Sequence, residues 1–466
     1  MSRAEKSSRT AVMNGDALTP ISIYQSLKGE KKCLLESSLK HEESGRYSFI
    51  AVNPYMELIG SLNKSLVINH LTGDKSEYSG KPLDQLQQLL DEQEIIPPEN
   101  LPFAGGAIGY IGYDAIRMYE EIGHVPEDRL QMPDVHVMLY DTAVMYDHKR
   151  HEVTITALNP NQIYTNTELD QRLSMIQSQL TNYTNVDPGI DQVKSLTYTS
   201  NINKQDYLQA VEQAKSHIKQ GDIFQIVLSQ RLSAPFSGSP FAFYRKLRQE
   251  NPSPYMFFIE FDEYTVLGAS PESLIKVKGR EVTTNPIAGT RKRGMTKQED
   301  QQLADELIHD EKELAEHRML VDLGRNDLGK VCEIGSVHLT KYMLIEKYQH
   351  VMHIVSEVKG TLASNMSGLE ALVSTLPAGT VSGAPKIRAM QLINEFETVK
   401  RGVYSGAVGY VGFDGNLDFA LAIRTMVIKD QVAHVQAGAG IVYDSVPESE
   451  FEETLNKARS LLEVKS

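Results

Sequence analysis

The chain has 466 residues, of which 41% are hydrophobic and 23% charged, as in an ordinary globular protein. This composition excludes a wholly disordered chain, and at about 150 residues a domain the length allows roughly three domains. The 47 Lys and Arg against 61 Asp and Glu give a net charge of −14, which argues against a nucleic-acid partner because a polyanion would be repelled.

The N-terminal region, residues 1–165, alternates short apolar runs with turn residues. Runs such as RYSFIAV (46–52) and EVTITAL (152–158) have the length and β-branched content of strands. We therefore expect this region to be β-rich. Residues 166–203 are polar, with one predicted helix near 167–180, and we expect them to connect it to a third region, residues 204–466.

From Lys204 to Gln220, apolar residues recur with a period of 3.6, which predicts a helix that ends at Gly221 before a strand over 223–230. The sequence GAIGYIGYD (106–114) recurs as GAVGYVGFD (406–414), 300 residues later. Two glycine-rich strands of one design suggest that the β regions of both halves meet. Because strands and helices come in blocks rather than in strict alternation, we expect an α+β fold.

The sequence shows no pattern typical of a targeting signal. No stretch is long and apolar enough to span a bilayer, and the polar start MSRAEKSSRT lacks the apolar core of a signal peptide. The two cysteines, Cys33 and Cys332, favour a reducing compartment over a disulfide framework. We therefore expect a cytoplasmic protein with no membrane partner.

Several common catalytic motifs are also missing, namely the phosphate-binding GxxxxGK[ST] loop, GxGxxG, GxSxG and HExxH. Paired carboxylates remain. Glu313 and Glu316 lie three residues apart on a predicted helix, and Glu450 and Glu453 do so on another. If both helices faced one cavity, four carboxylates would require a hard cation such as Mg²⁺. By spacing alone, each pair is more typical of a solvated helix face with i,i+4 salt bridges than of a metal site.

For one loop and three single residues, the sequence is consistent with either ligand binding or structural packing. The loop LPAGTVSGAPK (376–386) leads into a helix, whose free N–H groups would attract a carboxylate or simply be well capped. Arg424 lies in an apolar run, so it requires either a structural partner or an anionic ligand. His353 and Glu272 also stand in or beside apolar, strand-like runs.

Taken in order, a series of motifs resembles the chorismate-utilising enzyme family: GDIFQIVLSQR, NPSPYMFF, GASPES, NPIAGTRKRG, KELAEHRMLVDLGRND, LPAGTVSGAPK, RGVYSGAVGY, FALAIRTM, AGAGIVYDS and FEETLNKA. The resemblance is dense over residues 200–462, and LLES, RYSF and GGAIGYIGYD extend it toward the N-terminus. It implies two interlocking β-rich halves that form a large sheet sandwich surrounded by helices.

Two positions select a reaction within the family. Members that attack chorismate with water carry a lysine base where this chain has Gln225, and members that form aminodeoxychorismate carry a nucleophilic lysine where it has Ala288. A methyl group forms no covalent adduct, so the resemblance implies direct attack by ammonia. Anthranilate and pyruvate would form through aminodeoxyisochorismate, as the first committed step of tryptophan biosynthesis. The alternatives are aminodeoxychorismate formation for folate synthesis and a catalytically silent, tryptophan-binding regulatory subunit.

The resemblance also implies residue roles. Glu316 and Glu453 would bind Mg²⁺ directly, with Glu313 and Glu450 supporting them through water. Glu272 would protonate the departing C4 hydroxyl, and His353 is associated with pyruvate elimination. The predicted catalytic residues are therefore Glu272, His353 and Gln225. The positions that would contact the substrate are Thr380, Tyr404, Arg424, Gly438, Ala439, Gly440 and Lys457.

Two further motifs resemble the allosteric tryptophan pocket found in the family, LLESS (34–38) and NPSPYMFF (251–258). Glu36 and Ser37 would meet the polar end of the amino acid, and Pro254, Tyr255 and Met256 would line its ring. A plain strand and an Asn-Pro turn are the alternative. Neither cysteine stands in a glycine-rich elbow, so glutamine-dependent activity would require a separate glutamine amidotransferase subunit that delivers ammonia, in a heteromer.

Overall fold

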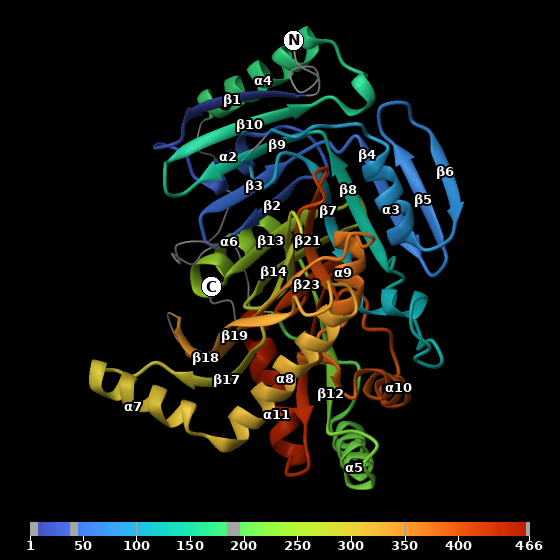
Figure 1. Ribbon diagram of the computed structural model, residues 1–466, viewed down its shortest axis with the longest axis vertical. Helices are drawn as coiled ribbons and strands as arrows, with labels where there is room; N and C mark the ends of the chain where they lie inside the picture. The colour runs from blue at the N-terminus through green and yellow to red at the C-terminus, as the bar shows by residue number, and fades with distance from the viewer. Residues whose placement is uncertain (1–7, 38–44, 99, 184–195, 349–350, 463–466) are drawn as a thin grey trace.

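The computed structural model describes residues 8–37, 45–98, 100–183, 196–348 and 351–462 (Figure 1). Within these ranges, the strands form two twelve-stranded sheets in which neighbouring strands run antiparallel. Each sheet contains strands from both ends of the sequence. The predicted α+β architecture of two β-rich halves surrounded by helices is therefore confirmed.

The first sheet has the order β1 (Ser8–Asn14), β10 (Glu152–Leu158), β9 (Thr142–Asp147), β3 (Tyr47–Ala51), β2 (Cys33–Glu36), β13 (Tyr255–Glu260), β14 (Tyr264–Ser270), β23 (Thr425–Lys429), β24 (Val432–Ile441), β12 (Gln225–Pro235) and β11 (Thr199–Ser200), with β20 (Gly383–Ala384) also paired to β12. The junction between β2 and β13 joins the N-terminal region to the rest of the chain.

The second sheet has the order β17 (Ile287–Lys292), β19 (Val351–Thr361), β16 (Glu281–Thr284), β15 (Ser273–Lys278), β22 (Leu417–Leu421), β21 (Ala407–Gly412), β7 (Gly106–Ile111), β8 (Val135–Tyr140), β4 (Met56–Ser61), β5 (Lys64–Asn69) and β6 (Lys75–Ser79), with β18 (His338–Lys347) paired to β19. Here β7 and β21 join the two parts of the chain.

The two glycine-rich strands predicted to meet are direct neighbours. Gly109 on β7 stands opposite Gly409 on β21. A Cβ on Gly109 would lie 2.1 Å from the carbonyl oxygen of His136, and a Cβ on Gly409 would lie 2.1 Å from that of Asp418. Each glycine therefore permits close approach of the adjacent strand, which explains why the same pattern occurs twice.

The core lies in layers. Aromatic side chains from both sheets, including Phe49 and Phe257 from the first and Tyr110 and Tyr410 from the second, pack between the sheets. Helices cover the outer faces and bury their apolar stripes there. They are α2 (Pro20–Ser26), α3 (Pro82–Asp91), α4 (Asn166–Thr181), α5 (Lys204–Gln220), α6 (Pro240–Glu250), α7 (Lys297–Ile308), α8 (Glu311–Gly329), α9 (Gly368–Thr375), α10 (Lys386–Phe396) and α11 (Pro447–Leu462).

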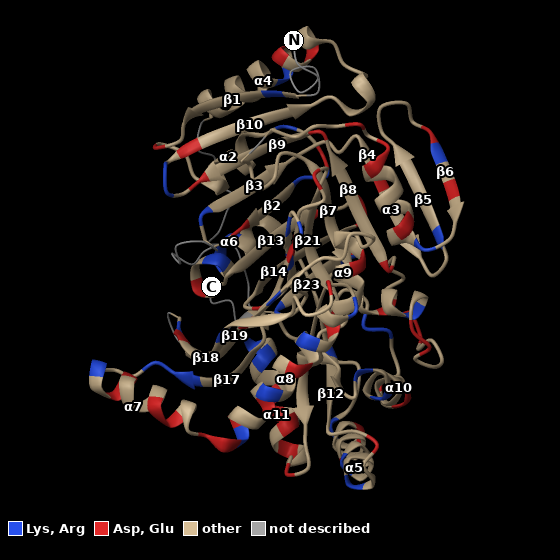
Figure 2. Cartoon of the chain, in the orientation of Figure 1, with Lys and Arg blue, Asp and Glu red and all other residues tan. Residues whose placement is uncertain are grey.

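The helices predicted near 167–180 and over Lys204–Gln220 are present as α4 and α5. The latter ends at Gly221, whose φ of 83° is a left-handed cap that glycine adopts without strain. Figure 2 shows acidic and basic residues interspersed along the helices. In the part of the chain that the structure describes, no helix is long and apolar enough to cross a membrane.

Candidate functional site

The strand pair β12 and β24 forms the floor of the candidate catalytic site. Gly440 stands opposite Val227 and Gly438 opposite Ser229, so both glycines share the face that carries Gln225. A Cβ on Gly440 would lie 2.7 Å from Gln225 Nε2, and one on Gly438 would lie 2.8 Å from Tyr404 Oη. The glycines thus leave room for these two polar side chains. Ala439 faces the other way, into an apolar cluster, so its main chain alone borders the site.

Carboxylates from α8 lie against this floor. Gln225 Nε2 donates to Glu316 Oε1 at 3.3 Å. Burial raises the pKa of Glu316, and the neighbouring charge of Glu313 adds to the effect. Glu313 itself has a partner in Arg291, at 3.3 Å. Glu316 therefore has a hydrogen bond from an amide, whereas Glu313 has an ion pair.

The second carboxylate pair lies on α11. Glu453 pairs with Lys457 at 2.8 Å, whereas burial raises the pKa of Glu450, with the charge of Glu453 contributing. Lys312 and Lys457 both act electrostatically on Glu316 and on Glu450. Carboxylates of the two helices thus share one electrostatic neighbourhood.

The carboxylate oxygens of α8 and α11 are suitable ligands for a hard divalent cation. Mg²⁺ prefers carboxylate oxygen, and the raised pKa values of Glu316 and Glu450 show that their charges lack full compensation. Among the described residues, however, no three acidic, histidine or cysteine side chains stand together at ligand spacing. A cation at this position would have to compete with Lys457 for Glu453.

Glu272 lies in the turn between β14 and β15. Its side chain is buried, and burial raises the pKa of the carboxyl to about 7. Thr380, in the loop before α10, donates its hydroxyl to Glu272 Oε1 at 2.9 Å. A carboxyl that is half-protonated near neutral pH is suited to general acid catalysis.

Lys457 connects α11 to the strand floor. Its Nζ donates to the carbonyl oxygen of Gly438 at 3.1 Å, and its own carbonyl accepts from Arg424 Nη1 at 2.5 Å. Arg424 sits at the bend between β22 and β23 with a φ of 50°, and burial lowers the pKa of its guanidinium. The charge of Arg424 also acts on Tyr404. These residues form one connected group beside Glu272, on which Lys457 acts as well.

His353 projects from β19 and bonds through Nδ1 to the carbonyl oxygen of Gly289 at 2.9 Å. A carbonyl only accepts, so this bond places the proton of the neutral ring on Nδ1 and leaves Nε2 as the basic nitrogen. Burial lowers the pKa of His353, and the charge of Arg424 lowers it further. His353 is therefore neutral at physiological pH and lies within electrostatic range of the group around Arg424.

A separate pocket lies between the sheets, with about 700 Å³ of space that is partly open to solvent. All five residues expected at an allosteric site line it, namely Glu36, Ser37, Pro254, Tyr255 and Met256. The Ser37 hydroxyl is buried and has no hydrogen-bond partner among the residues that the structure describes. Ser38, the last residue of the LLESS motif, lies outside the described residues.

Glu36 forms the back of this pocket. It accepts from the Tyr244 hydroxyl and from Arg248 Nε, each at 2.6 Å. Residues that the motifs did not indicate also line the pocket, including Tyr410 and Asp418 of the second sheet. Asp418 accepts from the Tyr255 hydroxyl at 3.0 Å. No local pattern identifies these residues, because the contact depends on how the two sheets face each other.

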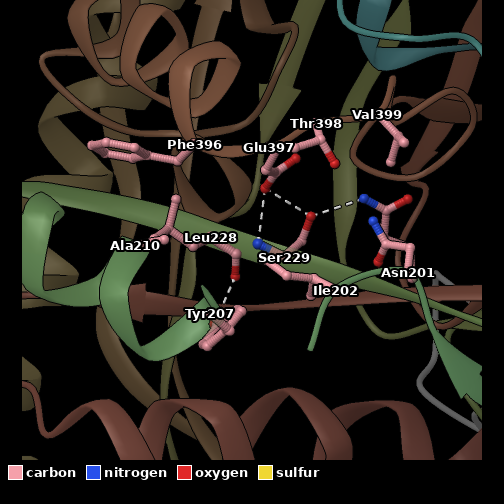
Figure 3. A pocket seen from close by; sticks show the side chains of 11 residues that line it. Asn201, Ile202, Tyr207, Ala210, Leu228, Ser229, Phe396, Glu397, Thr398 and Val399 are labelled. Atoms are coloured by element: carbon pink, nitrogen blue, oxygen red, sulfur yellow. Dashed lines mark hydrogen bonds between the residues drawn. The ribbon is translucent and has the colours of Figure 1, made fainter. Parts of the chain in front are cut away.

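Sequence motifs also missed the small pocket of Figure 3, behind the strand floor. The main-chain N–H and the hydroxyl of Ser229 both donate to Glu397 Oε1, at 2.8 and 2.9 Å, and Gln436 Nε2 donates to Ser229 Oγ at 2.8 Å. Tyr207 closes the pocket and donates its hydroxyl to the carbonyl oxygen of Leu228. The polar groups here largely satisfy one another, which indicates a structural network rather than a ligand site.

Comparison with known proteins places the chain in a family. A family model described as chorismate binding enzyme matches residues 31–463. The chain is 48% identical to anthranilate synthase component 1 of Lactococcus lactis over 453 residues, which cover 97% of this chain and 98% of the relative. It is 46% identical to the protein of that name from Acetivibrio thermocellus over 464 residues, which cover 97% and 94%.

Solved structures agree with these relatives. The crystal structure of anthranilate synthase component I from Streptococcus pneumoniae superposes with a TM-score of 0.82 at 44% identity, covering 97% of this chain and 98% of that one. The menaquinone-specific isochorismate synthase of Escherichia coli superposes with a TM-score of 0.74 at 20% identity, covering 98% and 94%, and shows the shared fold alone. The chain belongs to the chorismate-binding enzyme family and is a chorismate-utilising enzyme.

Proposed function

We propose that the chain is component I of an anthranilate synthase, which converts chorismate and ammonia into anthranilate and pyruvate. The observation that carries the proposal is Glu272, a buried carboxyl whose pKa is about 7 and which stands among the residues expected to hold the substrate. Full-length similarity to proteins named anthranilate synthase component 1 supports the choice of reaction. The methyl side chain of Ala288, on β17, supports attack by ammonia without a covalent lysine adduct.

In the first step, the nitrogen of ammonia forms a bond to C2 of chorismate while the C4–oxygen bond breaks. Glu272 gives its proton to the departing hydroxyl, which leaves as water, and the nitrogen then releases a proton, which restores the balance. Thr380 stabilises the resulting carboxylate through its hydroxyl. The side chain of Gln225 is a neutral amide, which cannot take a proton from water. Water is therefore not activated to compete with ammonia as the nucleophile.

In the second step, the C2–H and C3–oxygen bonds of aminodeoxyisochorismate break and the ring becomes aromatic. The enolpyruvyl group leaves as the enolate, which takes up one proton, equal in number to the one lost from C2, and becomes pyruvate. His353 accepts the C2 proton through Nε2, because its Nδ1 is already bonded to the carbonyl of Gly289. A histidine kept neutral by burial is in the form that this role requires.

Substrate binding is assigned to the main chain of β24 and to Arg424 at the bend between β22 and β23, beside Lys457 of α11. Arg424 would hold a carboxylate, and the main chain at Gly438 and Gly440 would approach the ligand closely. Bound Mg²⁺, held by Glu316 and Glu453 with Glu313 and Glu450 supporting it, would supply positive charge to the ring carboxylate and draw electrons from the diene.

Regulation and assembly complete the proposal. Tryptophan would bind in the pocket lined by Glu36 and Ser37 and inhibit by favouring a less active arrangement of the sheets. This pocket combines residues of the N-terminal region, 1–165, with residues of the region 204–466. Cys33 and Cys332 are both buried, so neither offers the exposed nucleophile of an amidotransferase. A separate glutamine amidotransferase subunit would therefore supply ammonia, in the cytoplasm, for the first committed step of tryptophan synthesis.

The test is a product assay. The purified chain, given chorismate, Mg²⁺ and an ammonium salt at alkaline pH, should release fluorescent anthranilate and an equal amount of pyruvate. Chelation of Mg²⁺ should abolish both. Aminodeoxychorismate as the sole product would support the folate alternative instead, and tryptophan binding without turnover would support the silent subunit.

A further inference from the structure

Arg401 is a buried arginine at the start of the segment RGVYSGAVGY (401–410), outside the set of predicted site residues. Its side chain is 1% exposed, and its guanidinium lies 4.8 Å from the ring centre of Tyr113 and 5.6 Å from that of Tyr404. Glu397 provides its counter-charge through two bonds, from Nε at 2.8 Å and from Nη2 at 2.6 Å. The same carboxylate accepts from Ser229 on β12 (Figure 3).

The remaining N–H groups of Arg401 reach three separate segments of the proposed catalytic site. Nη1 donates to the carbonyl oxygen of Val381 at 2.7 Å, next to Thr380, and to Ser405 Oγ at 3.3 Å, next to Tyr404. Nη2 donates to the carbonyl oxygen of Val227 at 2.7 Å, two residues from Gln225. One side chain therefore joins the loop of Thr380, the segment of Tyr404 and the strand of Gln225.

All five donors of the guanidinium are used by these five bonds. Lysine has three donors on a single nitrogen and cannot reproduce the planar arrangement of the five guanidinium N–H groups. We propose that Arg401, held by Glu397, is a positioning residue that sets Thr380, Tyr404 and Gln225 relative to one another. It acts through these residues and has no contact with the reacting atoms. This proposal rests on the proposed function, since the three positioned residues are those assigned to chorismate.

The positioning role makes a particular kinetic prediction. If Arg401→Lys displaces the loop of Thr380, kcat for anthranilate falls about 100-fold, the loss expected for a misplacement of about 1 Å. Thr380 also stabilises the ionised form of Glu272, so its displacement raises the pKa of that acid. The fall of kcat/KM at high pH, measured at constant ammonia, should therefore move to higher pH. A purely structural role would leave this midpoint unchanged.

Arg117 provides a matched control. It is a half-buried arginine that bonds Asp114 at 2.9 Å, Asn394 at 2.6 Å and the carbonyl oxygen of His124 at 3.0 Å. None of these bonds is made to Thr380, Tyr404, Gln225 or the residues next to them, and Arg117 touches the segment of Tyr404 only through Asp114, which accepts from the main-chain N–H of Gly402. Arg117→Lys should lower the melting temperature as Arg401→Lys does, but it should leave kcat per folded molecule and the pH midpoint unchanged.

Glu397→Gln provides a second variant in case Arg401→Lys fails to fold. It keeps the size of the side chain but removes the negative charge that orients the guanidinium of Arg401. We therefore expect a smaller fall in kcat than in Arg401→Lys, and a shift of the pH midpoint to higher pH, as in that variant. The proposal is overturned if the folded Arg401 or Glu397 variant matches Arg117→Lys in both kcat and midpoint. A wild-type chain that makes no anthranilate would overturn the proposed function instead, so the two failures are distinguishable.

Discussion

The proposed catalytic site and the pocket between the sheets each contain a buried glutamate, but the two carboxyls have different partners. Glu36 is 4% exposed and accepts from a guanidinium and a phenol, whereas Glu272 is 9% exposed and accepts from the hydroxyl of Thr380. Burial raises the pKa of Glu272 to about 7, although the hydrogen bond from Thr380 acts in the opposite direction. The same residue type thus lines a pocket in one region and has the raised pKa of the proposed acid in the other.

The largest expected effect follows from removing the acid. Glu272→Gln keeps the shape of the side chain but has no proton to give to the leaving hydroxyl, so kcat should fall by about 10²–10⁴-fold. The KM for chorismate should change little, because the amide fills the same space. Steady-state rates of anthranilate formation measure both constants. Full activity in this variant would remove Glu272 from the mechanism.

The same substitution should stabilise the fold at high pH. The pKa of Glu272 is about 7 in the folded chain against an ordinary 4.5, so the folded state holds the proton more tightly and loses stability as pH rises from 4.5 through 7. At pH 8, Glu272→Gln should therefore be more stable than the wild type by about 3 kcal/mol, the equivalent of the shift at 1.36 kcal/mol per unit.

Denaturant unfolding at pH 8 and near pH 4.5 checks this prediction. The gain in stability should shrink towards zero at the lower pH. Glu333→Gln is a suitable control, because Glu333 pairs with Arg280 at the surface, where the side chain is 48% exposed. Equal stabilities of the wild type and Glu272→Gln at pH 8 would mean that the ionised carboxyl is not strained by burial.

A smaller effect is expected from the other side of the comparison. Ser37→Phe should abolish inhibition by tryptophan, because the benzyl group would occupy the pocket that Ser37 lines, while turnover without tryptophan continues. The initial rate measured against tryptophan concentration tests this, and the fluorescence of bound tryptophan is readable because the chain contains no Trp. Ser76→Phe, at an exposed position on β6, is the control. Equal inhibition of both variants would contradict the assignment of the pocket.

Sequence predicted those parts of the molecule that depend on local pattern. The helix over Lys204–Gln220 follows from the spacing of its apolar residues, and the pairing of β7 with β21 follows from their shared glycine pattern. The site residues came from motifs, each of which is a short, continuous segment. Their placement in one connected group is a property of the fold.

The remaining features depend on contacts between distant segments. Asp418 enters the pocket because the two sheets face each other, and Arg401 contacts three segments that are separated in the sequence. The raised pKa of Glu272 likewise depends on burial of the carboxyl. That burial is set by the surrounding packing rather than by the motif GASPES. None of these properties has a local sequence signal, because each depends on long-range geometry.

The measurement that tests the account most directly is the ionisation of Glu272 itself. Infrared difference spectra between the wild type and Glu272→Gln isolate the C=O stretch of this one protonated carboxyl, and its amplitude can be followed against pH. We expect the band to be present at pH 6 and to disappear with a midpoint of about 7. A midpoint near the ordinary 4.5 would show that the buried carboxyl is ionised at neutral pH and would contradict its role as the acid.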